Sequence, residues 1–351
     1  FDEAGDVKFD SADTTFLKET TLLMDDTILN YIGGVSTTIN PTISHYSGMD
    51  ITNATLKYEV VNASDTVVSY GTLQSGVNIA NGQYFFFDSA QINMPSVTKA
   101  EQFTLNLILT ADNDYYTSSS WDIFVYPNAY LSASEIAGKT VMVSGDSSSY
   151  NFKEKYPFAT DWVDGSNPDL LVAFGSLSAS QIEYLNNGGK VFYAGTGSEV
   201  LKVENGTYYS QYVFMNFPKE DHQIVQSLAS KGYGGLQFIN MYTTNVITED
   251  KENPLSHSLI GKILIRDNVP DSLQTGSYMS EFKKGDGTII QSTFNFAFGD
   301  SVLAPYLIDQ TMRYLLGVGQ ESLTSASVVN VESQGLLKDS AKAYSALSFN
   351  A

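Results

Sequence analysis

The sequence contains no cysteine, and only three histidines and two tryptophans among its 351 residues. Without a thiol, the chain can form no disulfide, bind no metal through a thiolate and use no cysteine nucleophile. The histidines His45, His222 and His257 stand far apart, with no metal-ligand spacing such as H-x-x-x-H. We therefore expect no metal site and no cofactor.

Positive charge and long apolar runs are also scarce. Lysine and arginine total 19 against 39 aspartates and glutamates, which gives a net charge of -20. This charge repels phosphate backbones and anionic membranes, so nucleic acid is not an expected partner. No apolar run approaches the roughly 18 residues needed to cross a bilayer, and residues 1–20 lack the pattern of a signal peptide. We expect no membrane span.

The length and the remaining composition suggest two domains and a secreted protein. A chain of 351 residues is too long for one ordinary core. Few lysines and many Tyr, Thr, Ser and Asn residues are typical of a secreted or cell-surface bacterial protein, with an acidic cytosolic protein as the alternative. The abrupt start, "FDEAGDVKFD", suggests a piece of a longer polypeptide. We interpret residues 1–18 as a linker from a missing upstream domain.

Residues 19–128 show the pattern of an antiparallel β-sandwich. Short apolar runs rich in β-branched and aromatic residues alternate with turn residues about every ten positions. This spacing predicts an immunoglobulin-like β-sandwich. The strand-length runs are "TLKYEVVNAS", "TVVSYGTLQSG", "QYFFFDSAQINMP", "QFTLNLILTA" and "WDIFVYP".

Residues 129–318 follow a different pattern, which predicts an α/β domain. "KTVMVSG", "PDLLVAFG" and "GKVFYAGTG" are continuous apolar runs that end in glycine, as in parallel strands buried on both faces. Between the last two, "SLSASQIEYLNNGG" predicts a helix capped by Ser178 and ended by Gly188. A hairpin turning at Asp286-Gly287 and a helix ending before Gly317 complete the pattern. Residues 319–351 have no strong period and are interpreted as a linker or the start of a further module.

Ser147 is the one candidate nucleophile that a motif suggests. "VMVSGDSSSY" places Gly145-Asp146-Ser147 just after a strand, which resembles the first block of GDSL-type esterases. Those enzymes also need an Asn-Asp after a later strand and an Asp-x-x-His near the C-terminus, and neither is present. Without a base, a serine hydroxyl is scarcely nucleophilic. We expect no catalytic residue in this chain, with Ser147 as the alternative and a structural turn as the favoured interpretation.

The second glycine-rich turn, "YAGTGSEV", matches neither of the two motifs that it resembles. A dinucleotide fingerprint needs G-x-G-x-x-G, and a nucleophile elbow needs G-x-S-x-G. We predict a tight turn from strand to helix, with Ser198 as the cap.

Tyrosines in polar loops are the candidate glycan contacts, because a pyranose presents an apolar face to a flat ring. Tyr115, Tyr116, Tyr208 and Tyr209 lie in such loops. Phe85–Phe87 instead lie in a strand that is expected to fill a core. Core edges also take up such tyrosine pairs, so both interpretations stay open.

The junction between the two halves resembles a known enzyme family. Ser44-His45, Leu56–Val61, Tyr70-Gly71 and above all "WDIFVYP" (Trp121 to Pro127) are similar to the immunoglobulin-like domain that follows the catalytic barrel in glycoside hydrolase family 2. Ser120 departs from the family's usual Asn before Trp. "PDLLVAFGSLSASQIEYLNNGGKVFYAG" resembles a class I glutamine-amidotransferase-like, trehalose-utilisation-type domain with a flavodoxin-like fold, which some members append.

The resemblance implies a part of an enzyme rather than a whole one. In family 2 the catalytic glutamates belong to a barrel of about 250 residues, for which this chain has no room. An amidotransferase needs a cysteine that is absent here. The expected function is therefore a non-catalytic C-terminal accessory region of a secreted bacterial glycoside hydrolase acting on β-glycosides, whose partners are the upstream barrel of the same polypeptide and carbohydrate.

Two other functions stay open. One is a GDSL-like serine esterase that uses Ser147, with the sandwich as a binding module. The other is a surface-layer or adhesion protein, which the acidity and the lack of cysteine fit equally well.

Overall fold

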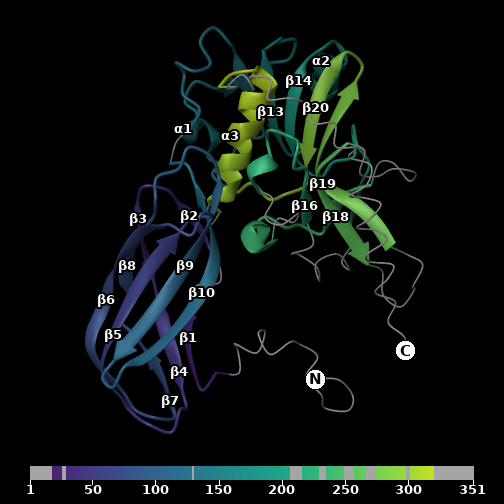
Figure 1. The fold of residues 1–351 in the computed structure, drawn as a ribbon. Helices are drawn as coiled ribbons and strands as arrows, with labels where there is room; N and C mark the ends of the chain where they lie inside the picture. Colours follow the sequence, from purple (N-terminus) through teal and green to yellow (C-terminus); the bar gives the residue numbers. More distant parts are fainter. Residues whose placement is uncertain are drawn as a thin grey trace. The chain divides into compact units, whose positions relative to one another are not determined.

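The computed structural model describes residues 18–25, 29–128, 130–205, 216–228, 235–248, 257–265, 273–297 and 301–319. Strands are the main secondary structure of these residues, and they form several separate sheets (Figure 1). The linkers expected over 1–18 and 319–351 lie almost wholly outside the described residues.

Residues 20–126 form a five-stranded sheet (β2-β10-β9-β5-β6), a three-stranded sheet (β1-β4-β7) and the pair β3-β8. All their pairings are antiparallel except that of β2 with β10, which is parallel. The strands are β1 (Thr20–Met24), β2 (Asn30–Ile32), β3 (Ser36–Ile39), β4 (Pro41–His45), β5 (Ile51–Val61), β6 (Val67–Ile79), β7 (Gln83–Phe86), β8 (Ala90–Asn93), β9 (Glu101–Ala111) and β10 (Tyr115–Tyr126).

Side chains along these strands alternate between a buried face and a more exposed face of the sheet. In β9, Phe103, Leu105, Leu107 and Leu109 are buried, while the residues between them are only partly buried. These side chains share a core with Ile43 of the three-stranded sheet, so the sheets pack face to face. The antiparallel strands predicted from the sequence are confirmed, except that residues 83–95 form two strands, β7 and β8, instead of one.

The second half forms one mixed sheet with a parallel part. Strands β12-β11-β13-β14-β20 are parallel neighbours in that order, and β19 joins β20 antiparallel. Beyond β19 the sheet branches: β17 and β18 each pair with β19, β15 pairs with β17, and β16 pairs with β18. The strands are β11 (Val141–Ser144), β12 (Thr160–Asp161), β13 (Leu170–Phe174), β14 (Lys190–Ala194), β15 (Val203–Asn205), β16 (Asn216–Pro218), β17 (Asn245–Ile247), β18 (Ser258–Ile265), β19 (Leu273–Lys284) and β20 (Gly287–Ser292).

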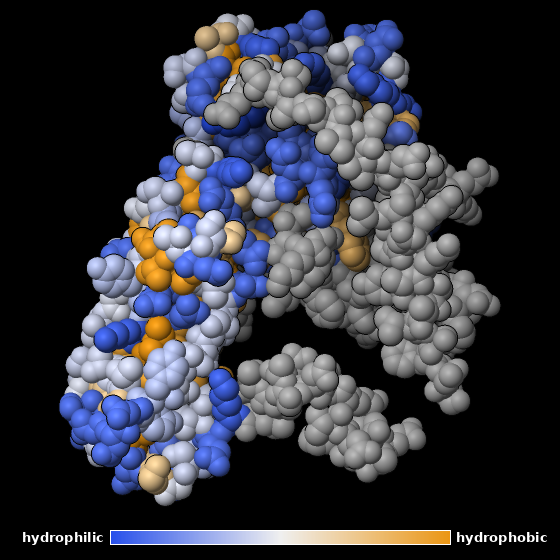
Figure 2. Space-filling model, viewed as in Figure 1, coloured by the Kyte–Doolittle hydropathy of each residue, from blue (hydrophilic) through white to orange (hydrophobic). Residues whose placement is uncertain are grey.

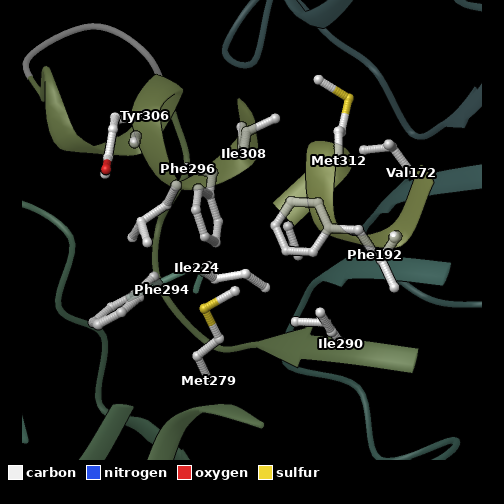
Figure 3. Close-up of a cluster of buried hydrophobic side chains, with 14 of the residues drawn as sticks. Val172, Phe192, Ile224, Met279, Ile290, Phe294, Phe296, Tyr306, Ile308 and Met312 are labelled. Carbon is white, nitrogen blue, oxygen red and sulfur yellow. The ribbon is translucent and has the colours of Figure 1, made fainter. Parts of the chain in front are cut away.

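Helices cover both faces of the parallel strands. Val172, Phe192 and Ile290 lie in one cross-strand row, and they pack with Ile308 and Met312 of α3 (Leu303–Leu316), as Figure 3 shows. The alternate residues, among them Leu171, Val191 and Ile289, pack with Tyr184 and Leu185 of α2 (Ala179–Asn186) on the other face. Burial on both faces explains why these strands are continuously apolar in sequence.

Local capping explains where α2 and α3 begin and end. Ser178 caps α2 through a capping box with Gln181, in which each side chain bonds the other residue's backbone N–H. Gly317 ends α3 in the left-handed conformation at φ 66°. Both predicted helices are confirmed. The predicted hairpin is confirmed as well, but its turn is Gly285-Asp286, one residue earlier than expected, because Gly287 already pairs with Lys284.

Short helices complete the second half of the chain. They are α1 (Phe152–Lys155) and the 3₁₀ turns η3 (Gln226–Leu228) and η4 (Gly235–Phe238). The α1 helix follows β11, and the two 3₁₀ turns pack Leu228 and Phe238 into the same core as α3.

The core of the second half also includes two residues of the sandwich. Ala100 and Tyr126 are both buried within it. The Tyr126 hydroxyl donates to Oε1 of Gln237 at 2.8 Å, and Nδ2 of Asn30 donates to the Gln237 carbonyl at 2.6 Å. The Tyr306 hydroxyl of α3 accepts from the Ala100 backbone at 3.3 Å. Residues 18–318 thus share buried contacts across the sandwich and the mixed sheet.

Candidate functional site at the carboxyl edge of the parallel strands

The loops at the carboxyl edge of the parallel strands diverge at one point, which makes this edge a candidate ligand site. The chain goes from β11 to β12 on one side and then to β13 on the other, so the loops after β11 and β13 diverge. In open sheets of parallel strands, ligands bind at the carboxyl ends where the strand order reverses. The loop from Gly145 to Tyr150 follows β11 and the glycine-rich turn from Gly195 to Gly197 follows β14, so both lie at this edge.

The loop after β11 is held by its own polar groups. The carboxylate of Asp146 accepts from the backbone N–H groups of Phe152 at 3.0 Å and Lys153 at 3.1 Å, so it satisfies the free donors at the start of α1. The exposed Ser147 accepts from the Ser149 N–H at 3.3 Å. In the part of the chain that the structure describes, Ser147 has no imidazole partner, and its contacts are those of a turn.

All three histidines lie in other surroundings. His45 is buried in the sandwich, where Nδ1 lies 2.7 Å from the Thr20 hydroxyl and Nε2 lies 2.7 Å from the Met49 carbonyl oxygen. His257 is exposed, with its ring against Phe282. His222 contacts Glu281. None of these contacts includes Ser147.

The second glycine-rich turn packs tightly against the neighbouring loop. A Cβ on Gly195 would lie 2.5 Å from the Gly175 carbonyl oxygen, so only glycine fits there. The prediction that Ser198 caps a helix is wrong. The chain continues into β15 instead, and Ser198 exchanges hydrogen bonds with the backbone of Val203 at 3.1 and 3.3 Å. These bonds close a local turn, which explains the serine without any helix.

A cross-strand row with three polar side chains lies just before these turns. Ser144, Ala173, Tyr193 and Gln291 are successive partners across four strands. Nε2 of Gln291 donates to the Gly197 carbonyl at 2.9 Å, which fixes the orientation of the amide. In the described residues, neither Oε1 of Gln291 nor the Ser144 hydroxyl has a hydrogen-bond partner, although both atoms are buried.

Tyr193 and Glu199 complete this edge. The Tyr193 hydroxyl donates to Glu199 at 3.1 Å and accepts from the Gly197 N–H at 3.1 Å. Burial and the neighbouring carboxylate raise the pKa of Tyr193, so the phenol stays protonated. The edge offers hydrogen-bonding groups, but among the described residues Ser144, Ser147 and Ser198 bond neither a histidine nor a carboxylate. This row is visible in the sequence, because Ser144 and Gln291 follow apolar residues within β11 and β20.

His222, Glu281 and Tyr314 form a second polar cluster, which sequence reasoning missed. Nε2 of His222 lies 3.4 Å from Oε2 of Glu281, and the Tyr314 hydroxyl donates to Oε1 at 2.9 Å. The His222 ring also packs on Tyr314, with centroids 4.9 Å apart. The contact with His222 lowers the pKa of Glu281, and burial opposes that shift. The three residues come from separate segments, so no local motif could show them.

We expect Glu281→Gln to lower the free energy of unfolding by about 1 kcal/mol at pH 7. Because the folded pKa lies below the ordinary value of 4.5, the carboxylate stabilises the fold above that pH. The contribution is lost as the pH falls through the folded pKa, so the difference from wild type should shrink at pH 3.5. Urea unfolding at both pH values measures this. Glu183→Gln, at an exposed position of α2, is the control, and an equal loss there would refute the assignment.

The predicted tyrosine contacts are only partly described. Tyr208 and Tyr209 lie outside the described residues. Tyr115 is half-buried and packs against the sandwich core and His45, whereas Tyr116 is 63% exposed. Neighbouring residues of a strand point to opposite faces, so this pair does not form one surface. The expectation that Phe85–Phe87 all fill the core is wrong for Phe86, which is 66% exposed.

A cavity of about 260 Å³ lies at the opposite, amino edge of the parallel strands. Its polar groups serve the structure around it. Nζ of Lys190 donates to the Leu315 carbonyl at 2.6 Å and Nζ of Lys139 to that of Leu316, so both cations sit at the C-terminal end of α3. Asp169 accepts from the backbone and hydroxyl of Thr140, and these bonds lower the pKa of the carboxyl group.

Neither a metal site nor a membrane-spanning helix is found among the described residues. No group of three or more His, Asp and Glu side chains gathers there as a metal site would need. No described helix is long and apolar enough to cross a membrane.

Comparison with known proteins adds one family match. Residues 36–127, from β3 to the end of β10, match a family described as a domain of unknown function (DUF8488). No curated protein matches the chain.

Similar solved structures resemble only parts of this chain. A family 123 glycoside hydrolase from Clostridium perfringens has 10% identity and a TM-score of 0.24, covering 36% of this chain and 30% of its own. The sporulation control protein Spo0M from Bacillus subtilis has 15% identity and a TM-score of 0.21, covering 31% and 49%. The CARDB domain of the PF1109 protein from Pyrococcus furiosus has 7% identity and a TM-score of 0.22, covering 31% and 92%. We draw no argument from likenesses of this size.

Proposed function

We propose that this chain is a non-catalytic accessory region of a secreted bacterial glycoside hydrolase, in which the sandwich and the α/β part act as one rigid brace. The proposal rests on one observation, the buried hydrogen bonds and shared core that join the two parts. A spacer that supports a catalytic barrel must hold its own parts in fixed positions. Two loosely linked domains would meet through a polar interface, whereas these two parts share an apolar core.

The segment "WDIFVYP" explains how the brace is built. Its alternate residues Ile123 and Val125 are buried in the sandwich core. Phe124 and Tyr126 point to the other side and pack with the core of the second half. The end of β10 therefore belongs to both cores at once, which gives a physical reason for the motif that most resembles family 2.

Strand order and pairing support the finer fold assignments within this proposal. The mostly antiparallel pairing of residues 20–126, with two larger sheets that share one core, is compatible with an immunoglobulin-like sandwich. Numbered along the chain, the parallel strands have the order 2-1-3-4-5, the order of flavodoxin-like folds. The serine-esterase alternative has no comparable support, because the contacts of Ser147 are those of a turn.

Replacing Tyr126 with phenylalanine should destabilise both parts together. The change removes the buried hydrogen bond from the Tyr126 hydroxyl to Oε1 of Gln237, at a cost of about 0.5–1.5 kcal/mol. Burial raises the pKa of Tyr126 above its ordinary value, so its hydroxyl remains a donor across the usual pH range. Tyr116→Phe, at an exposed position, should change the free energy of unfolding by less than about 0.5 kcal/mol.

The two tryptophans allow each part to be observed separately. Trp121 packs against the sandwich core and Trp162 against the core beneath α2. We expect Trp162→Phe and Trp121→Phe variants to unfold in guanidinium with one midpoint by fluorescence, and Tyr126→Phe to shift both equally. Separate midpoints would contradict the brace. Turnover of aryl β-glycosides by the repurified chain would contradict the non-catalytic role.

A further inference from the structure

The outer face of the three-stranded sheet gathers aromatic side chains that no core uses. The inward residues Ile43, Phe85 and Phe87 contact the sandwich core. By alternation, the residues between them point outward. We define the aromatic face as the outward residues Leu23, Thr42, Ser44, Tyr46, Tyr84 and Phe86.

Three rings of this face are strongly exposed to solvent. Tyr46 is 60% exposed, Tyr84 is 47% exposed and Phe86 is 66% exposed. Tyr46 directly follows β4, and its N–H donates to the Glu19 carbonyl at 2.7 Å, which extends the ladder between β1 and β4. Single exposed apolar side chains are ordinary, but a group of aromatic rings on one sheet face marks an interaction surface.

Contacts within the face hold two of these rings in place. The Tyr84 hydroxyl lies 3.0 Å from the hydroxyl of Thr42, which is itself only 2% exposed. The rings of Tyr84 and Phe86 meet edge to face, with centroids 5.0 Å apart and planes at 81°. The planes of the two rings are therefore nearly perpendicular. Binding to such preformed rings costs little side-chain entropy.

The neighbouring five-stranded sheet also carries exposed rings, but they do not lie together. Tyr116 of β10 and Tyr70 of β6 are separated by β9 and β5, and the positions near Tyr116 include the polar residues Asn106 and Ser120. On the side of the sandwich seen in Figure 2, apolar residues form separate patches within a mostly polar surface. The exposed ring of Tyr70, which is 78% exposed on β6, lies outside the aromatic face and serves as a matched control.

Charge selects the class of ligand. The chain has a net charge of -20, yet no outward position within β1, β4 and β7 is charged. An anionic polymer would be repelled by the whole protein and by the exposed Glu19, which lies opposite Tyr46 at the rim of this face. A neutral ligand with flat apolar surfaces and many hydroxyls fits both the rings and the hydroxyls of Ser44 and Tyr84.

We propose that the aromatic face binds neutral polysaccharide, with a pyranose ring stacked on Tyr84 or Phe86. This inference rests on the proposed accessory function and names its ligand class and site. Ser44 and the tyrosine hydroxyls supply hydrogen bonds to the sugar hydroxyls, while the rings bury its apolar face.

Affinity electrophoresis in gels containing xyloglucan, mixed-linkage β-glucan or galactomannan tests the proposal. We expect wild type to be retarded by at least one of these polymers and Phe86→Ala to bind it at least tenfold more weakly. Tyr84→Ala should weaken binding similarly, and Tyr70→Ala should bind as wild type does. Polygalacturonate, an anionic polymer, should not retard the protein.

Three outcomes would overturn the proposal. They are no retardation of wild type by any neutral polymer, an equal loss in Tyr70→Ala, or self-association in analytical ultracentrifugation that Phe86→Ala abolishes, which would assign the face to a second copy of the chain. Far-ultraviolet circular dichroism confirms that each variant is folded. The unfolding midpoints of the two tryptophan variants do not depend on polysaccharide binding. A negative binding result therefore refutes the aromatic face alone, and separate midpoints refute the brace alone.

Discussion

Replacing Gly145 with alanine is expected to lower the free energy of unfolding by more than about 3 kcal/mol. Gly145 follows β11 in the left-handed region at φ 70°. An added Cβ would lie 1.9 Å from the carbonyl oxygen of Phe174, which is backbone and cannot rotate away. The end of β13 must then move, and with it the stacked rings of Tyr150 and Phe174, whose centroids are 4.3 Å apart.

A second glycine, Gly138, allows the free-energy cost of the steric clash to be measured apart from the cost of the left-handed backbone conformation. Gly138 has φ 79°, but an added Cβ would meet nothing within 4 Å. Gly138→Ala should therefore cost only about 1–2 kcal/mol, the price of the left-handed conformation. Guanidinium unfolding of both variants measures the difference. Similar losses in the two variants would show that the turn after β11 is not tightly packed.

The elements of the second half could be predicted from sequence because each has a local cause. "LLVAF" and "VFYA" are continuously apolar because the strands are buried on both faces. Ser178 and Gln181 predict the start of α2 because the capping box spans only four consecutive residues. The Ser198 prediction failed because a strand followed by Gly-x-Gly-Ser suits a strand-to-strand turn as well as a strand-to-helix turn.

The candidate surfaces were harder to predict because they depend on partners far apart in sequence. "QYFFF" contains four consecutive aromatic residues, and only the pairing with β4 decides that Phe86 points outward and Phe85 inward. Likewise, His222 and Glu281 meet through tertiary packing, without a spacing that a local pattern could show. The contacts of the Ser147 loop are local, because Asp146 and Ser149 lie beside Ser147 in the sequence.

The buried carboxylate of Asp309 in α3 leads to the other large effect. Asp309 is 3% exposed, accepts from the Leu131 N–H, and accepts from Nε of Arg313 at 2.6 Å. Burial raises the pKa of Asp309, and the bond from Arg313 opposes that shift. Arg313→Met should cost about 3–5 kcal/mol at pH 7, because it leaves a buried charge without its partner. Urea unfolding of the variant measures this loss.

The pH dependence and a double variant separate charge from packing. In Arg313→Met the folded pKa of Asp309 lies further above its unfolded value, so the folded state binds a proton more readily and gains stability as the pH falls. Arg313 also holds the pKa of Glu135 at about 2, so wild type loses that contribution in acid and the gap between the proteins narrows further. Asp309→Asn combined with Arg313→Met keeps an acceptor for Leu131 and removes both charges. We expect this double variant to be more stable than Arg313→Met alone at pH 7, and a loss as large as in the single variant at every pH would show that packing, rather than the buried charge, sets the cost.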